Sequence, residues 1–185
     1  MRMRRIGSTA AISKTCSSPP EVSDASPIRE RPTARVVLLD PADRLLLMRG
    51  RLPGSEPGRG AWFTVGGGIE PGETAREAAA REIVEETGFL NVELGPAVWQ
   101  RTGVLQIPEP ALFRETYFLA RCPGGEPTRA GWDDIERALI EDLRWWSLAQ
   151  IAATADHVFP PGLAHLLPPL LAGVLPAEPF EIPWD

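Results

Sequence analysis

Three glutamates, Glu82, Glu85 and Glu86, crowd together near the middle of this sequence. Residues three and four apart on a helix share a face, so on a helix these carboxylates would repel one another by roughly a few tenths of a kcal/mol per pair. A bound cation would relieve that repulsion, because hard divalent metal ions prefer carboxylate oxygens as ligands. The spacing therefore points to a site for Mg²⁺ or Mn²⁺.

An ordinary solvated helix is the alternative interpretation. Glu77, Arg81 and Glu85 follow one another at intervals of four, which is the spacing of ion pairs along an exposed helix face. The register of a longer segment, which begins with three glycines at Gly66, favours the metal site. Its fixed positions are Gly67, Glu73, Arg81, Glu82, Ile83, Glu85, Glu86 and Gly88, followed by the apolar Phe89.

The ends of this helix can be predicted from its flanking residues. Thr74 followed three residues later by Glu77 is a capping-box pattern, which starts the helix at about Ala75. Gly88 is well placed to end the helix in the left-handed conformation. On such a helix Ala80 and Ile83 are expected to face a sheet, and the three glutamates are expected to form a separate face.

The segment resembles the signature of the Nudix hydrolases, enzymes that cleave nucleoside diphosphates linked to another group. The resemblance implies an α/β fold, a Nudix-like α/β/α sandwich around a mixed β-sheet. It also implies that Glu85 and Glu86 are metal ligands, that Glu82 is a ligand or general base, and that the backbone carbonyl of Gly66 adds a ligand. One position departs from the family, where a proline commonly precedes the glycines and this chain has Val65.

Further roles follow from the same resemblance. Glu73 and Arg81 would tie the glycine loop to the helix, with Arg81 part of the catalytic set and Gly67, Glu73 and Gly88 structural positions of the motif. A metal ligand from outside the helix is common in the family. Glu115 is the first candidate because its charge lies between apolar neighbours on a strand, and Glu136 and Glu141 are the alternatives.

Other side chains suit contacts with substrate. Arg49 and Arg51 at the end of a strand are candidates for phosphate binding, with exposed solubilising arginines as the equal alternative. Several aromatic residues could stack on a base, although aromatic residues in strands are more often part of the core. They are Trp62, Phe63, Trp99, Trp145 and Trp146.

The surrounding sequence predicts one domain with two tails. Residues 1–30 are rich in Ser, Pro and Arg and are expected to form a flexible arm. Residues 31–155 carry the domain, with strands expected near residues 33–40, 44–50, 61–65, 92–105, 111–122 and 142–148 and a helix after Ser147. Residues 156–185 form a Pro-rich tail, in which Pro168 and Pro169 should break the helical pattern into short surface pieces.

The composition of the chain excludes several classes of binding partner. The net charge of −6 and the isoelectric point near 5.1 argue against a broad nucleic-acid-binding surface. No apolar run reaches the roughly 18–20 residues of a membrane span. Cys16 and Cys122, the only cysteines, form no disulfide framework, which fits a reducing, cytoplasmic location. The expected partner is a small nucleotide, and both a monomer and a homodimer remain open.

The sequence therefore predicts a Nudix-type pyrophosphohydrolase that cleaves a phosphoric anhydride by water attack on phosphorus. A non-catalytic nucleotide sensor is one alternative, but it predicts the loss of a glutamate. Non-nucleotide diphosphate chemistry, such as isoprenoid diphosphate isomerisation, is the other and would call on Cys122. Substrate specificity is expected in the loop 51–60, the strands from Trp99 to Tyr117, and the tail.

Overall fold

The structure is a computed structural model, and it describes residues 28–51, 60–107, 109–132 and 134–184. Within these residues eight strands join in one mixed sheet, and four helices accompany it. The strands are β1 (Arg29–Leu39), β2 (Leu45–Arg51), β3 (Gly60–Thr64), β4 (Glu93–Ile107), β5 (Glu109–Arg121), β6 (Ile140–Trp146), β7 (His157–Phe159) and β8 (Phe180–Glu181). The helices are α1 (Ala75–Thr87), α2 (Asp134–Leu139), α3 (Leu148–Ala153) and α4 (Leu163–Leu171).

Strand β1 lies at the centre of the sheet, whose order is β7-β3-β2-β1-β5-β4-β8 with β6 paired to β2. It runs parallel to β5 from Arg29 opposite Ala111 to Leu39 opposite Arg121. The run from Val36 to Leu39 is buried at every position, as expected for a strand that is covered on both faces. The sheet therefore needs helices on both sides.

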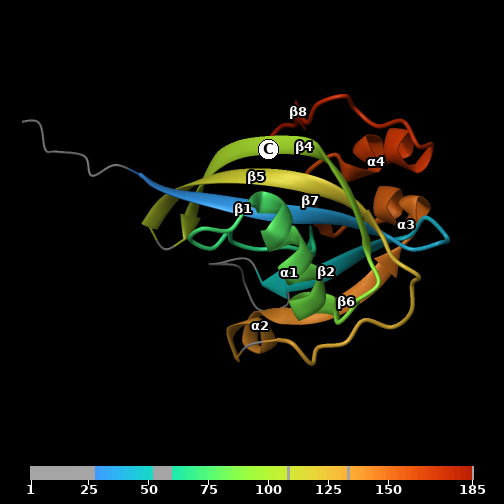
Figure 1. Cartoon of the computed structure of the whole chain (residues 1–185), viewed down its shortest axis with the longest axis horizontal. Helices are drawn as coiled ribbons and strands as arrows, with labels where there is room; N and C mark the ends of the chain where they lie inside the picture. Colours follow the sequence, from blue (N-terminus) through green and yellow to red (C-terminus); the bar gives the residue numbers. More distant parts are fainter. Residues whose placement is uncertain (1–27, 52–59, 108, 133, 185) are drawn as a thin grey trace, which may run out of the picture.

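Those helices divide the core into two layers (Figure 1). Val36 and Leu38 pack with Ala78, Ala79 and Ile83 of α1 in one apolar cluster. On the other face the alternate residues Val37 and Leu39 join a second cluster, to which α3 and α4 contribute Ile151, Leu163, Leu167 and Leu170. This arrangement confirms the predicted α/β/α sandwich around a mixed sheet.

Helix α1 has the predicted ends. Thr74 and Glu77 form the full capping box, and Gly88 ends the helix with φ 73°. The expected division of faces is wrong in one respect. Ala80 is exposed, whereas Glu82 and Glu86 are buried. These two glutamates lie next to Ile83 on the inward side because a glycine loop, without side chains of its own, covers them.

The two tails differ from the expectation in detail. Strand β1 already begins at Arg29, inside the expected arm, and residues 1–27 lie outside the described part of the chain. In the C-terminal tail, Pro168 and Pro169 lie inside α4 and do not break it. Leu163, Leu167 and Leu170 recur on one face and are each 2% exposed. Their burial outweighs the loss of the two proline N–H donors, so this helix belongs to the core.

Several short elements were not foreseen by the sequence patterns. Helix α2 and the two- and three-residue strands β7 and β8 are too short to show a periodicity. The helix after Ser147 was foreseen, and its capping box with Gln150 confirms the expected start. Among the described residues no helix is both long enough and apolar enough to span a bilayer.

Candidate active site

Arg81 is the centre of a network that joins α1 to the loop before it. Its Nε and Nη2 atoms donate to the two carboxylate oxygens of Glu73, at 3.0 and 3.1 Å. Its Nη1 donates to Glu82 and Glu85, both at 2.9 Å, and its Nη2 also donates to the carbonyl of Gly68 at 2.9 Å. The bidentate pair with Arg81 lowers the pKa of Glu73. One guanidinium therefore fixes two of the three clustered glutamates.

Glu86 is held from the other side of the same loop. Its carboxylate is buried and accepts a 2.7 Å hydrogen bond from the backbone N–H of Gly66. Gly66 has φ +129°, and a Cβ there would lie 2.1 Å from the carbonyl oxygen of Ala34. A Cβ on Gly67 would lie 2.5 Å from Oε1 of Glu82, whereas one on Gly68 would have nothing within 4 Å. Gly66 is thus required by the backbone geometry, Gly67 is required for the position of the Glu82 carboxylate, and Gly68 is required for neither.

A second loop closes the C-terminal end of α1. The indole N–H of Trp132 donates to the carbonyl of Glu86, and the N–H of Thr128 donates to the carbonyl of Thr87, both at 2.8 Å. A Cβ on Gly131 would lie 2.5 Å from the carbonyl oxygen of Glu85. These contacts satisfy carbonyls that a helix end leaves unpaired. Sequence reasoning missed them, since no regular pattern marks residues 128–132.

Glu115 lies among cations. Its carboxylate accepts from Arg101, from Arg35 at 3.3 Å and from the hydroxyl of Tyr117 at 2.6 Å. Burial alone would raise the pKa of Glu115, but the charges of Arg35 and Arg101 hold it below its usual value. Burial and the negative charge of Glu115 raise the pKa of Tyr117. The contacts of Glu115 are with arginines and a phenol, so a metal-ligand role has no support from its surroundings.

Arg49 and Arg51, the predicted phosphate donors, share a carboxylate. Nη1 of Arg49 and Nε of Arg51 lie 2.7 and 2.9 Å from the two oxygens of Glu141. Glu141 was an alternative metal ligand, and the structure places it between these two cations. The side chain of Glu136, the other alternative, lies outside the described part of the chain, as do residues 52–59 of the expected specificity loop.

The aromatic residues divide between core and site. Trp62, Trp99 and Trp146 belong to the core cluster on the α3 and α4 side, and Trp145 packs against the other cluster. Phe63 is only partly buried and stacks on Phe159, with ring centroids 5.4 Å apart and 10° between the planes. The core interpretation therefore holds for the tryptophans, while Phe63 lines a cavity.

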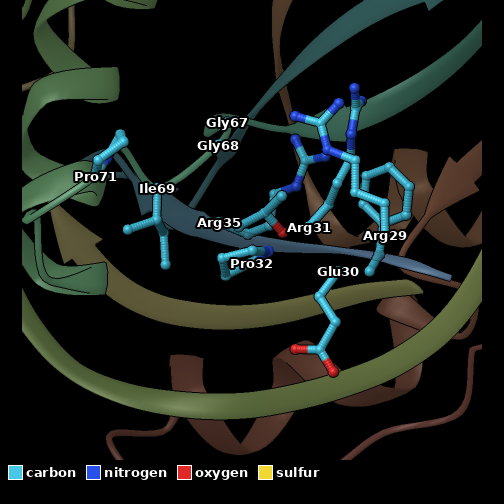
Figure 2. A pocket seen from close by; sticks show the side chains of 11 residues that line it. Arg29, Glu30, Arg31, Pro32, Arg35, Gly67, Gly68, Ile69 and Pro71 are labelled. Atoms are coloured by element: carbon cyan, nitrogen blue, oxygen red, sulfur yellow. The ribbon is translucent and has the colours of Figure 1, made fainter. Parts of the chain in front are cut away.

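Two cavities adjoin the glycine loop. One of about 230 Å³ is lined by Gly66, Glu86, Arg35 and Phe63, together with apolar residues of β2, the end of α2 and the start of β6. The other, of about 460 Å³, lies along the start of β1 and is lined by Gly67, Gly68 and Arg35 among others (Figure 2). Arg35 lines both and donates to the carbonyl of Gly66 at 2.6 Å, so the two cavities are neighbours.

The sequence itself matches the NUDIX domain over residues 29–167, three quarters of the chain. The chain belongs to the Nudix family. Its Nudix segment is similar to that of a mouse protein named 8-oxo-dGDP phosphatase NUDT18, with 28% identity over 138 residues, covering 69% of this chain and 41% of the mouse protein. A zebrafish oxidized purine nucleoside triphosphate hydrolase is 28% identical over 122 residues, covering 61% of this chain and 75% of its own length.

The fold is also that of solved Nudix structures. The crystal structure of a MutT protein from Methanosarcina mazei Go1 superposes with a TM-score of 0.56 and 18% identity, covering 80% of this chain and 96% of that one. At this identity the likeness concerns the fold alone. The chain spans less than half the length of the mouse relative.

Cys122 has the surroundings of a core residue in this Nudix fold. It is buried at the end of β5 within the cluster that packs on α1. Burial raises the pKa of its thiol. A catalytic role for Cys122 in isomerase-type chemistry therefore has no support in its environment.

The donor set of the Nudix helix suits a hard divalent cation. Glu82, Glu85, Glu86 and the carbonyl of Gly66 are all oxygen donors, and guanidinium groups already bring positive charge to them through Arg81 and Arg35. In the described part of the chain, however, no group of three or more His, Cys, Asp or Glu side chains is arranged to hold a metal ion. A bound ion would have to share these oxygens with the arginines.

Proposed function

We propose that this Nudix chain is a metal-dependent pyrophosphohydrolase that cleaves a diphosphate linkage in a nucleotide or nucleoside diphosphate derivative. The observation that carries the proposal is the Arg81 network. A single guanidinium binds Glu73, Glu82, Glu85 and the Gly68 carbonyl, beside a cavity that Glu86 lines. An ordinary solvated helix has no need of buried glutamates held in this way, because each buried carboxylate loses its hydration.

Mg²⁺ or Mn²⁺ would be held by Glu82, Glu85 and Glu86 with the carbonyl of Gly66. When bound, the ion neutralises charge on the diphosphate and lowers the pKa of a water molecule that attacks phosphorus. The second lone pair of the Gly66 carbonyl remains for the ion, since the carbonyl accepts one hydrogen bond from Arg35. Glu115 is left out of this set because its oxygens are taken up by arginines and Tyr117.

The protein's own groups position the reactants. Arg81 and Glu73 hold the glycine loop against α1, which keeps the carboxylate of Glu82 against the loop and that of Glu86 at the cavity without further reorganisation. Glu82 is the candidate general base, because its carboxylate is buried next to the glycine loop among the clustered glutamates. Arg49 and Arg51 would donate to substrate phosphates in competition with Glu141.

The names of relatives suggest the first substrates to test. The mouse relative is named for 8-oxo-dGDP and the zebrafish relative for oxidized purine nucleoside triphosphates. We therefore expect a nucleotide substrate, and a purine nucleotide with an oxidised base is the first compound to test.

A panel measurement of kcat/KM tests the proposal. The purified chain with Mg²⁺ or Mn²⁺ would be offered triphosphates, 8-oxo-dGTP, 8-oxo-dGDP, ADP-ribose, nucleotide sugars and dinucleoside polyphosphates at equal concentration. We expect hydrolysis of at least one of them to a nucleoside monophosphate and the matching second product, which is phosphate, pyrophosphate, a sugar phosphate or a second nucleotide, and no hydrolysis in EDTA. Turnover of only a non-nucleotide diphosphate would overturn the nucleotide assignment, and undiminished turnover in EDTA would overturn the metal.

A further inference from the structure

The larger cavity runs along the first half of β1, and all residues from Arg29 to Thr33, together with Arg35, line it. In a strand, residues two apart project to the same side, so Arg29, Arg31, Thr33 and Arg35 form a single row, and all four line the 460 Å³ cavity. Figure 2 shows the side chains of Arg29 and Arg31 on one side of the strand and that of Glu30 pointing away from them. Glu30 instead pairs with Arg114 at 3.1 Å. Three arginines and the ion-paired carboxylate of Glu30 therefore line the cavity, so its wall carries a net positive charge although the whole chain carries a net charge of −6.

Two cations of the row have no counter-charge among the residues that the structure describes. In the described part of the chain, no carboxylate lies within ion-pair distance of Arg29 or Arg31. Most other arginines of this structure have one, for example Arg81, Arg101 and Arg114. The contact of Arg31 is with an aromatic face, since its guanidinium carbon lies 5.9 Å from the centre of the Phe113 ring. Both groups are thus available to an anion.

Thr33 adds an independent observation. Its side chain is 5% exposed, and its hydroxyl has no hydrogen-bond partner among the described residues. A buried hydroxyl without a partner destabilises the fold because it has lost its hydration, and such groups in native proteins usually meet a ligand or water. Because Thr33 lies between Arg31 and Arg35 in the row, an anion bound there would supply the missing partner.

We propose that Arg29, Arg31 and Thr33 bind a chain of linked phosphates, namely the polyphosphate of the substrate. This assignment rests on the proposed function. Neighbouring residues of the row are about 7 Å apart along the strand. Two linked phosphates can therefore contact two of these residues at once, whereas a single phosphate reaches two of them less well. Arg35 lines this cavity and the one beside Glu86, so the row leads to the clustered glutamates. The site therefore favours nucleoside triphosphates over substrates with fewer phosphates.

Phosphate binding measured without a metal ion distinguishes this site from one formed by the glutamates and a metal ion. Calorimetry with the full chain in EDTA and about 0.15 M salt, where charges more than about 8 Å apart are screened, would compare tripolyphosphate, pyrophosphate and phosphate. We expect affinity to fall in that order. Arg31→Gln should weaken tripolyphosphate binding about tenfold or more, because a charged donor is lost.

Two further variants distinguish binding from structure. Thr33→Val keeps the shape and removes the partnerless hydroxyl, so the melting temperature should stay or rise while tripolyphosphate binding weakens a few-fold. Arg121→Gln is the matched control, since it removes one positive charge from the far end of the neighbouring strand β5, where Arg121 pairs with Asp43 outside the cavity, and it should leave binding unchanged. Wild-type affinity in both Arg31→Gln and Thr33→Val would overturn the site.

Kinetics then tests whether the bound phosphates belong to the substrate. Arg31→Gln should raise KM for a nucleoside triphosphate more than for a nucleoside diphosphate derivative, with little change in kcat. Weakened tripolyphosphate binding with an unchanged KM would overturn the substrate assignment. If no nucleotide is hydrolysed by the wild-type chain, the proposed function fails, whereas the calorimetry still decides whether the cavity binds phosphates.

Discussion

Gly67 and Glu82 are in such close contact that no side chain fits between them. A Cβ on Gly67 would lie 2.5 Å from Oε1 of Glu82. Gly67→Ala should therefore push this carboxylate out of position, while the helix and the sheet stay intact because only the end of a flexible side chain has to move. Misplacement of about 1 Å can cost on the order of 100-fold in rate.

Gly68→Ala is the matched control, since a Cβ there meets nothing within 4 Å. Nucleotide hydrolysis and thermal melting would be measured on both variants. We expect Gly67→Ala to lose activity at a nearly unchanged melting temperature and Gly68→Ala to resemble the wild type. Equal activity in the two variants would contradict a catalytic role for the position of Glu82.

Glu86→Gln should lower turnover by orders of magnitude without unfolding the protein. Glutamine retains an oxygen that can accept from the N–H of Gly66, but it removes one negative charge from the proposed metal site. The variant should also need more Mg²⁺ for half-maximal activity. Glu77→Gln is the control on the same helix, because glutamine also serves in a capping box. Wild-type kinetics in Glu86→Gln would remove Glu86 from the site.

Glu115 should make stability depend on acid pH. Its pKa is below the usual value in the folded state, so its contribution is fully present above the unfolded pKa of about 4.3 and is lost as pH falls through the folded pKa. Glu115→Gln should lower the free energy of unfolding at pH 7 by about 3–5 kcal/mol, since it leaves Arg35 and Arg101 without their carboxylate. The loss of stability on acidification should be smaller in this variant.

Denaturant unfolding at several pH values between 7 and 3 measures both effects. Glu30→Gln makes the same charge change in an exposed pair and should have little effect on stability at pH 7. If Glu115→Gln were as stable as Glu30→Gln, the buried cluster of Glu115, Arg35 and Arg101 would not stabilise the fold.

Leu167→Ala should destabilise the protein by about 2–5 kcal/mol, because it opens a cavity under α4. Leu167 is 2% exposed, whereas Leu175, in the segment after α4, is 44% exposed. Leu175→Ala should therefore change stability by no more than about 0.5 kcal/mol. Chemical denaturation of both variants checks the result, and equal stabilities would show that α4 does not stabilise the domain.

The ends of α1 could be predicted from residues close to them in the sequence. The surroundings of the site residues depend on contacts between residues far apart in the sequence, and these could not be predicted. Thr74 and Glu77 act within the first turn of α1 and Gly88 acts at its last turn, so the residues next to each end were enough to predict both helix ends. The burial of Glu82 and Glu86 was missed because it depends on a loop without side chains, which a helical pattern cannot represent. The roles of Glu115 and Glu141 also depend on partners far away in sequence, namely Arg35 and Arg49, at separations of 80 and 92 residues.

Helix α4 in the C-terminal tail also shows that a local sequence rule cannot account for tertiary packing. The rule that proline interrupts a helix is local, and it correctly identifies two missing donors at Pro168 and Pro169. It does not include the apolar face of Leu163, Leu167 and Leu170, which packs on the sheet and keeps α4 together. Likewise, alternation along β1 could have been noticed at Arg29, Arg31, Thr33 and Arg35, but only the structure shows that this face lines a cavity.

The hydrogen bond from the indole of Trp132 to the carbonyl of Glu86 couples the last turn of α1 to the loop 128–132. Fraying of that turn would carry the glutamates with it, and it requires this bond and the one from Thr128 to Thr87 to open together. In amide hydrogen exchange, Gly88 and Thr128 should therefore behave as one cooperative unit with similar protection. The loop would then set how often the clustered carboxylates leave their positions, although these two hydrogen bonds are made to backbone carbonyls and not to the carboxylates themselves.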